Sequence, residues 1–137
     1  YKLINLNGDD IPELYARNSK YGGSLWTIAN GEVKQLQKWD NSMAGAISNY
    51  SETNHTFVTL SALSELYFEY AIWSLSDNGE VNKEKAFTNN NGKYSVDYIS
   101  VTQAQYESLM KSEVTSLESV FSTSNDLSIS QLRSRLG

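Results

Sequence analysis

Asn30 and Gly31 stand between two strand-like segments, residues 25–29 and 32–39. Both residue types adopt a positive φ more readily than most others, so the pair is the usual connection of a two-residue β-hairpin. Such a loop fixes the register of the two strands and pairs Ile28 with Val33 and Trp26 with Gln35. A chain with this hairpin near its start is expected to build an antiparallel sheet.

Other strand-like segments follow the same pattern, each ended by a polar or glycine-containing turn. They cover residues 1–6, 13–17, 46–50, 56–63, 66–75, 81–88 and 94–99. The aromatic segment 66–75 is expected to be a central strand. A weak repeat, Trp26 to Val33 against Trp73 to Val81, leaves open two blade-like hairpin units. Two hairpins that use the favoured Asn-Gly turn independently would explain it equally well.

The periodicity changes to helical near the C-terminus. Thr102 and Gln105 have the spacing of a capping box, and apolar residues recur at helical spacing as far as Val114. Ser128 and Gln131 repeat the capping spacing, which indicates a short helix with its apolar residues inward: Ile129, Leu132 and Leu136. We therefore expect one α+β domain over residues 1–137. It would be mainly an antiparallel β meander over about 1–100, with one or two helices in 101–137.

Composition and missing motifs exclude several classes of protein. Sixteen acidic residues against 11 basic ones give a formal charge of −5, which argues against a nucleic-acid-binding protein. No apolar run reaches the roughly 20 residues that a membrane helix needs. The chain lacks Cys and begins at Tyr1 without a signal peptide. We therefore expect an extracellular or cell-envelope protein whose export signal lies upstream. Because no catalytic motif accompanies the single His55, the sequence favours a non-enzymatic domain.

A short loop, residues 5–13, carries side-chain oxygens at regular intervals. Asn5, Asn7, Asp9 and Glu13 occupy loop positions one, three, five and nine, and the carbonyl of Ile11 occupies position seven. Calcium takes six to eight oxygens from loops of this kind. The spacing predicts a calcium site that ties two strands together, with a dissociation constant of about 0.1–1 mM. The alternative is a turn whose Asn and Asp side chains cap its own amides.

The stretch Leu3–Leu14 contains Asn-Leu-Asn-Gly-Asp-Asp-Ile-Pro-Glu-Leu. It resembles the Asp-x-Asn-Gly-Asp-Gly-Ile-Pro-Glu-Leu opening of FG-GAP/VCBS-like segments in secreted proteins and lipoproteins of Gram-positive bacteria. The resemblance implies an exported protein with aromatic hairpins and a capped C-terminal helix, and Tyr70–Val81 and Ile99–Met110 are similar to that continuation. This chain departs from the family at Asn5, where Asp is usual, and at Asp10, where Gly is usual. Both departures weaken the ligand set for calcium.

Aromatic residues are the other candidate binding groups. Trp39, Tyr21 and Tyr50 could form a platform on which a sugar ring stacks, whereas Trp26 and Trp73 are expected in the core. The sequence thus predicts a non-enzymatic extracellular or cell-envelope domain that binds a protein or glycan partner. A carbohydrate-binding module is one alternative. An appendage of an enzyme whose catalytic part is missing is the other.

Overall fold

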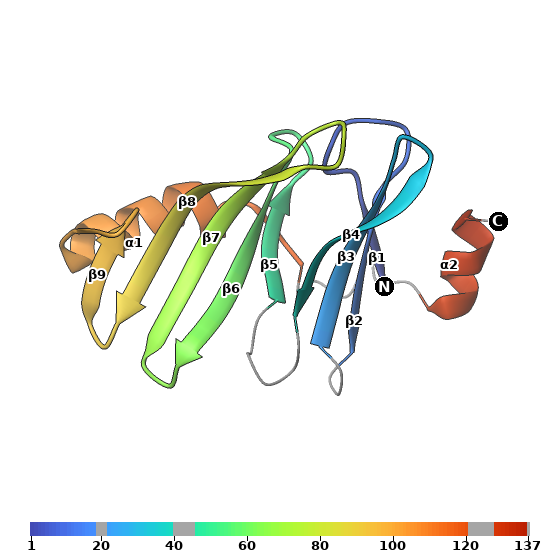
Figure 1. Ribbon diagram of the computed structural model, residues 1–137. Helices are drawn as coiled ribbons and strands as arrows, with labels where there is room; N and C mark the ends of the chain where they lie inside the picture. Colours follow the sequence, from blue (N-terminus) through green and yellow to red (C-terminus); the bar gives the residue numbers. More distant parts are fainter. Residues whose placement is uncertain (19–21, 40–45, 121–127, 137) are drawn as a thin grey trace.

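The computed structural model describes residues 1–18, 22–39, 46–120 and 128–136. Two antiparallel sheets stand side by side, a smaller one from the first strands of the chain and a larger one from the later strands (Figure 1). Consecutive strands are neighbours within both sheets, except at one edge of the larger sheet. The predicted β-rich α+β class and its meander arrangement are therefore confirmed.

The smaller sheet has the order β1-β2-β3-β4. Its strands are β1 (Lys2–Ile4), β2 (Glu13–Asn18), β3 (Gly22–Ala29) and β4 (Glu32–Trp39). Asn30 (φ 54°) and Gly31 (φ 78°) connect β3 to β4. Across this turn Ile28 pairs with Val33 and Trp26 with Gln35, so the predicted hairpin register is confirmed.

The larger sheet has the order β10-β9-β8-β7-β6-β5-β11. Its strands are β5 (Ala46–Ser51), β6 (Thr56–Ser64), β7 (Tyr67–Leu75), β8 (Val81–Asn90), β9 (Lys93–Val96), β10 (Ile99–Ser100) and β11 (Glu118–Ser119). The aromatic strand β7 lies in the middle, as expected. Because a propeller blade has four strands, a seven-stranded sheet does not fit the two matching blade-like units that the repeat left open.

The expectation of one strand over residues 94–99 is wrong, because the chain reverses direction inside it. Asp97 and Tyr98 have φ values of 50° and 66°, and Val96 pairs with Ile99 across them. Asp is among the residues that tolerate a positive φ, whereas a bulky side chain rarely adopts it. The residue types therefore gave no turn signal here.

The two hairpins that resemble each other in sequence meet in the structure. The second turn is a three-residue loop, residues 77–79, closed by a 2.9 Å hydrogen bond from Ser76 N to the Glu80 carbonyl. Lys34 on β4 donates a 2.9 Å hydrogen bond to the Gly79 carbonyl. A Cβ atom at Gly79 would lie 3.0 Å from the Cβ of Ala29. The two sheets are therefore joined at these tips.

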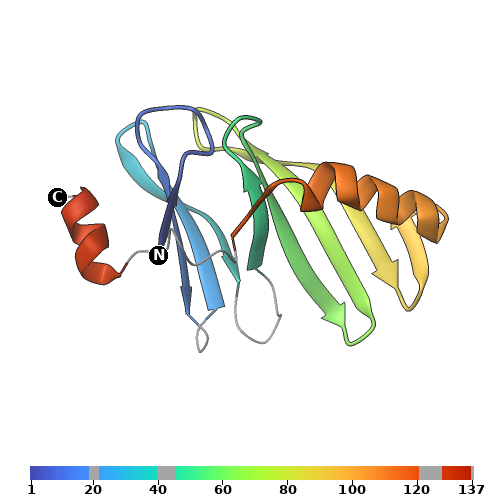
Figure 2. The ribbon, with the colours of Figure 1, turned by 180° about the vertical axis from the view of Figure 1, so that it is seen from behind.

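The helix α1 (Gln103–Met110) continues as a π-helical turn, η2 (Lys111–Thr115), and the two lie across one face of the larger sheet (Figure 2). Gln105 N donates to Thr102 Oγ1 at 3.1 Å, and Thr102 N donates to the Gln105 side chain at 3.0 Å. This reciprocal pair confirms the predicted capping box.

The last helix, α2 (Ile129–Leu136), begins with the same reciprocal pair between Ser128 and Gln131, at 2.8 and 3.2 Å. Leu132 is buried, as expected. Ile129 is 53% exposed, so its predicted inward orientation is wrong. The side chain of Leu136 lies outside the described part. Within the described residues, no helix is long and apolar enough to cross a bilayer.

Apolar side chains form two clusters. The first lies where the two sheets meet and contains Ile4, Leu6, Tyr15, Leu25, Ile47, Tyr50, Phe57, Leu75 and Val120. The second lies between the larger sheet and the α1–η2 segment and contains Val58, Phe87, Tyr106, Met110 and Val114. The larger sheet thus has one face covered by a helix, and only part of its other face meets the smaller sheet.

Candidate functional site

The loop between β1 and β2 is held together by its own side chains. Asn5 Oδ1 accepts a hydrogen bond from Gly8 N at 2.9 Å, and Asn5 Nδ2 donates to the Asp9 carbonyl at 2.7 Å. Asn7 Oδ1 accepts from Asp9 N at 3.1 Å. The Asp9 carboxylate accepts from Asn7 Nδ2 at 2.9 Å and from Ile11 N at 2.8 Å. The structure therefore brings three predicted ligands together, but as caps for the loop's own amides.

Glu13, the last predicted calcium ligand, is fully buried beneath this loop, with 0% of its surface exposed. One carboxylate oxygen accepts from Leu6 N at 2.8 Å and the other from Thr27 Oγ1 at 2.8 Å. Burial raises the pKa of Glu13 above its ordinary value of 4.5, although both hydrogen bonds oppose the rise. The loop therefore has the geometry of the amide-capped turn, and the calcium site stays a prediction. Among the described residues, no three or more His, Cys, Asp or Glu side chains form a metal-holding group.

The predicted aromatic platform is not assembled from the described residues. Tyr50 is 8% exposed and belongs to the first core, so its ring offers no open face for stacking. Tyr21 and the side chain of Trp39 lie outside the described residues. The backbone of Trp39 pairs with Gly23 at the end of β4.

Trp26 and Trp73, expected in the core, are only partly buried. The Trp73 ring packs beside Phe57, with centroids 6.4 Å apart and planes 11° apart, and borders the first core. Its Nε1 donates to Thr59 Oγ1 at 2.9 Å. Trp26 belongs to neither core, so the expectation for this residue is wrong.

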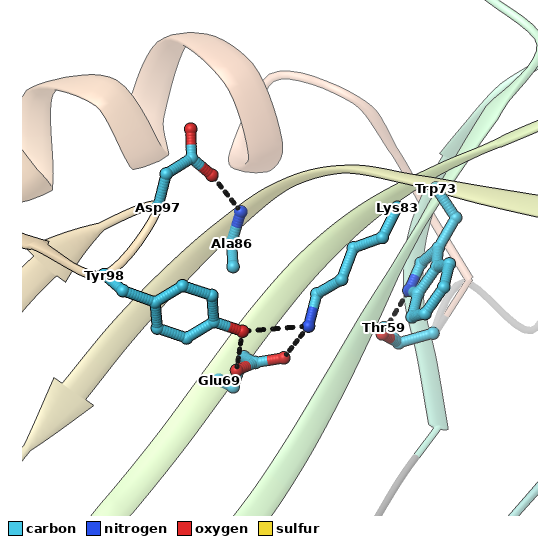
Figure 3. A network of polar contacts seen from close by, with 7 residues as sticks. All are labelled: Thr59, Glu69, Trp73, Lys83, Ala86, Asp97 and Tyr98. Carbon is cyan, nitrogen blue, oxygen red and sulfur yellow. Dashed lines mark hydrogen bonds and ion pairs between the residues drawn. The ribbon is translucent and has the colours of Figure 1, made fainter.

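A group of polar and aromatic side chains lies on the face of the larger sheet that α1 does not cover (Figure 3). We call it the open-face cluster; its members are Glu69, Trp73, Lys83 and Tyr98. Lys83 Nζ donates to Glu69 Oε1 at 2.7 Å and to Tyr98 Oη at 3.1 Å. Tyr98 Oη donates to Glu69 Oε2 at 3.2 Å. The Lys83 ammonium also lies 5.7 Å from the ring centroids of both Trp73 and Tyr98.

A β-bulge places the Lys83 side chain on this face. Lys85 pairs with Ile72 and Lys83 pairs with Trp73, so two consecutive residues of β7 face a segment of β8 with one extra residue, Glu84. An extra residue reverses the alternation of side chains along a strand. Lys85 consequently points to the helix side, where it forms an ion pair with Glu113 at 2.9 Å. Lys83 points to the open face.

The turn that carries Tyr98 is fixed to β8 by its neighbour Asp97. Asp97 N donates to the Ala86 carbonyl at 2.8 Å, and Ala86 N donates to Asp97 Oδ1 at 2.9 Å (Figure 3). Tyr98 itself has a φ of 66°, a conformation that costs a bulky residue about 1–3 kcal/mol. Its side chain is nevertheless 63% exposed, so apolar burial does not explain why this residue occupies the strained position.

The cluster offers hydrogen-bond donors and acceptors beside an exposed aromatic ring. Partial burial would lower the pKa of Lys83, but the hydrogen bonds from its ammonium to Glu69 and Tyr98 outweigh this and raise it. Lys83 therefore stays charged at neutral pH. The Glu69 side chain is 15% exposed and is neutralised by Lys83, so it is poorly suited to act as a general acid or base. The arrangement can bind a polar ligand, and nothing in it activates a nucleophile.

Sequence reasoning missed this cluster for two physical reasons. Strand alternation places Glu69 and Trp73 on one face, and that signal was available. Lys83 reaches the same face only through the bulge, and Tyr98 only through a turn that its residue type disfavours.

A scan against protein-family models found no match, and searches of the curated proteins and of the solved structures found none either.

Proposed function

We propose that this chain is a non-enzymatic binding domain of an extracellular or cell-envelope protein, and that a neutral carbohydrate binds to the open-face cluster. The observation that carries this proposal is the exposed Tyr98 ring, held in a strained conformation beside a preformed set of polar groups. Strained residues are concentrated at functional sites. Groups that are already fixed lose little conformational entropy when a ligand binds.

The chemistry of the cluster fits a sugar better than a protein surface. The centre of a protein–protein interface is depleted of charged residues, whereas the centre of this cluster is the ion pair of Lys83 and Glu69. An ammonium, a carboxylate and a phenol can exchange hydrogen bonds with neighbouring hydroxyls of a sugar ring. The apolar face of that ring would lie against Tyr98.

The proposed extracellular or cell-envelope location rests on other features. The resemblance of Leu3–Leu14 to segments of exported proteins supports it, as does the lack of Cys. We assign calcium no part in sugar binding, because the loop of residues 5–13 is separate from the cluster and the Glu13 carboxylate is already hydrogen-bonded.

The test is calorimetric titration of the protein with neutral oligosaccharides, namely the hexamers derived from cellulose, xylan, mannan and chitin. Tyr98→Ala should weaken binding of any responding sugar at least about tenfold, because losing an anchoring aromatic typically costs more than 1 kcal/mol. Lys83→Gln should weaken binding as well. Lys85→Gln is the matched control, since it removes a lysine two residues away on the opposite face.

Two results would contradict the proposal. One is that no hexamer binds at millimolar concentration. The other is that Tyr98→Ala and Lys85→Gln bind a sugar equally well. Sugars that are cleaved or chemically reduced after long incubation would overturn only the non-enzymatic part of the proposal.

A further inference from the structure

The outer face of the smaller sheet contains a hollow of about 490 Å³, and no member of the open-face cluster lines it. Ser24 and the half-buried Trp26 on β3 line it, together with Gln35 and Lys38 on β4. Arg17 also lines it, but strand alternation places its side chain on the same face as Tyr15. Trp26 pairs with Gln35 and Ser24 with Lys38, so cross-strand pairing places these four side chains on one face.

Another β-bulge makes this arrangement possible. The register between β3 and β4 shifts between Leu25 and Trp26, which leaves Leu36 as the extra residue. Gln35 and Lys38, three residues apart, therefore share the outer face, although regular alternation would separate them. Leu36 packs against the first core.

The Trp26 ring lies along its own strand. Its Nε1 donates a 2.8 Å hydrogen bond to Ser24 Oγ, two residues earlier on the same face. This bond fixes the indole beside Ser24, and the ring, which is only partly buried, lines the hollow. An indole in this position presents a flat apolar surface of the size of a pyranose ring.

The charge of the hollow is opposite to that of the chain. The whole chain has a formal charge of −5, yet the described lining of the hollow places the cation Lys38 on the outer face beside Trp26 and includes no carboxylate. A site of this sign in an acidic protein favours an anion. Lys38 and Gln35 add donors that can reach a carboxylate on a ring stacked over Trp26.

We infer that this hollow is a second binding site, selective for a uronic-acid unit of an acidic polysaccharide, with the sugar ring over Trp26 and its carboxylate at Lys38. The site is independent of the open-face cluster. It has the volume of a small-ligand site and combines an aromatic floor with a few polar groups.

The experiment is calorimetric titration of the full chain with trigalacturonic acid, with galactotriose as the neutral counterpart and sodium sulfate as an anion without a sugar ring. Trigalacturonic acid should bind at least about tenfold more tightly than galactotriose, and its affinity should fall as salt is added. Lys38→Gln should remove most of that preference. Trp26→Phe, which keeps a smaller ring, should weaken binding of the acidic sugar several-fold.

Lys93→Gln is the matched control, because Lys93 is an exposed lysine on β9. It should bind trigalacturonic acid as the unchanged protein does, and so should Tyr98→Ala, which disables only the open face. Equal affinity for the acidic and neutral trisaccharides would overturn the inference. It would also be overturned if Lys38→Gln had no effect, or if sulfate displaced trigalacturonic acid at equal concentration. None of these results would bear on sugar binding at the open face.

Discussion

Replacing Glu13 by Ala tests whether the buried carboxylate stabilises the β1–β2 loop. The change leaves Leu6 N without its 2.8 Å acceptor in a site where Leu6 is 0% exposed. An unsatisfied buried N–H costs about 1–3 kcal/mol. The space vacated by a fully buried side chain adds about 1–2 kcal/mol. We therefore expect Glu13→Ala to lower the free energy of unfolding by about 2–5 kcal/mol, measured by urea denaturation followed by circular dichroism.

Glu13→Gln separates the charge from the hydrogen bonds. Its side-chain oxygen can still accept from Leu6 N, and the Thr27 hydroxyl can rotate to accept from the new amide. Glu13 has a raised pKa in the folded protein, so the folded state binds this proton more tightly than the unfolded chain. The stability that this proton contributes is complete below about pH 4.5 and is lost as pH rises through the raised pKa. The stability of Glu13→Gln relative to the unchanged protein should therefore increase with pH over that range.

Two outcomes would refute this explanation. One is that Glu13→Ala lowers the free energy of unfolding by less than about 1 kcal/mol, which would mean that water satisfies Leu6 N. The other is that the unchanged protein and Glu13→Gln show the same pH dependence. The latter result would mean that the Glu13 pKa is the same in the folded and unfolded states.

Three further predictions concern the turns. In thermal unfolding, 5 mM calcium should raise the melting temperature of the EDTA-treated protein by no more than about 1 °C, because the loop's side-chain oxygens already accept hydrogen bonds. A rise of several degrees would show instead that the loop binds calcium. In urea denaturation, Gly8→Ala should cost at least about 1 kcal/mol more than Gly31→Ala, and equal costs would contradict this. Both glycines have a positive φ, but the new Cβ would overlap the His55 ring at Gly8, whereas nothing lies within 4 Å of it at Gly31. Tyr98→Asn should leave the free energy of unfolding unchanged or raise it by up to about 1 kcal/mol, since Asn tolerates the positive φ, and sugar binding should be lost. A clear loss of stability would show that the exposed ring has a structural role.

Local signals in the sequence predicted the elements whose geometry depends on a few neighbouring residues. The Asn30-Gly31 turn determined the β3–β4 register, and the Thr102–Gln105 pair determined where α1 begins. Both depend on hydrogen bonds and φ preferences within four residues, which a single sequence displays. The amide-capped turn at residues 5–13 also depends on hydrogen bonds between close neighbours, so the sequence offered it as the alternative to the calcium site.

The binding surfaces could not be predicted in this way, because they depend on non-local register. The bulge at Glu84 decides which lysine joins Trp73, and the bulge at Leu36 decides which face of the smaller sheet receives Lys38. A bulge shifts every later side chain to the opposite face, and no residue type marks its position reliably. The exposure of Trp26 likewise follows from where the second sheet packs, and its apolar neighbours on β3 do not reveal it.

The edge strand β11 has a consequence for how the protein is made. Glu118 pairs with Tyr50 on β5, and the adjacent Val120, 1% exposed, completes the cluster between the two sheets. Every other member of that cluster lies in residues 4–75. During synthesis the two meanders can form as soon as they leave the ribosome, since their contacts are local. Their shared cluster lacks Val120 until that residue has emerged, about 45 residues after Leu75 at roughly 5–20 residues per second. For those seconds the cluster is short of one buried side chain, and a chain terminated before β11 would lack that side chain permanently.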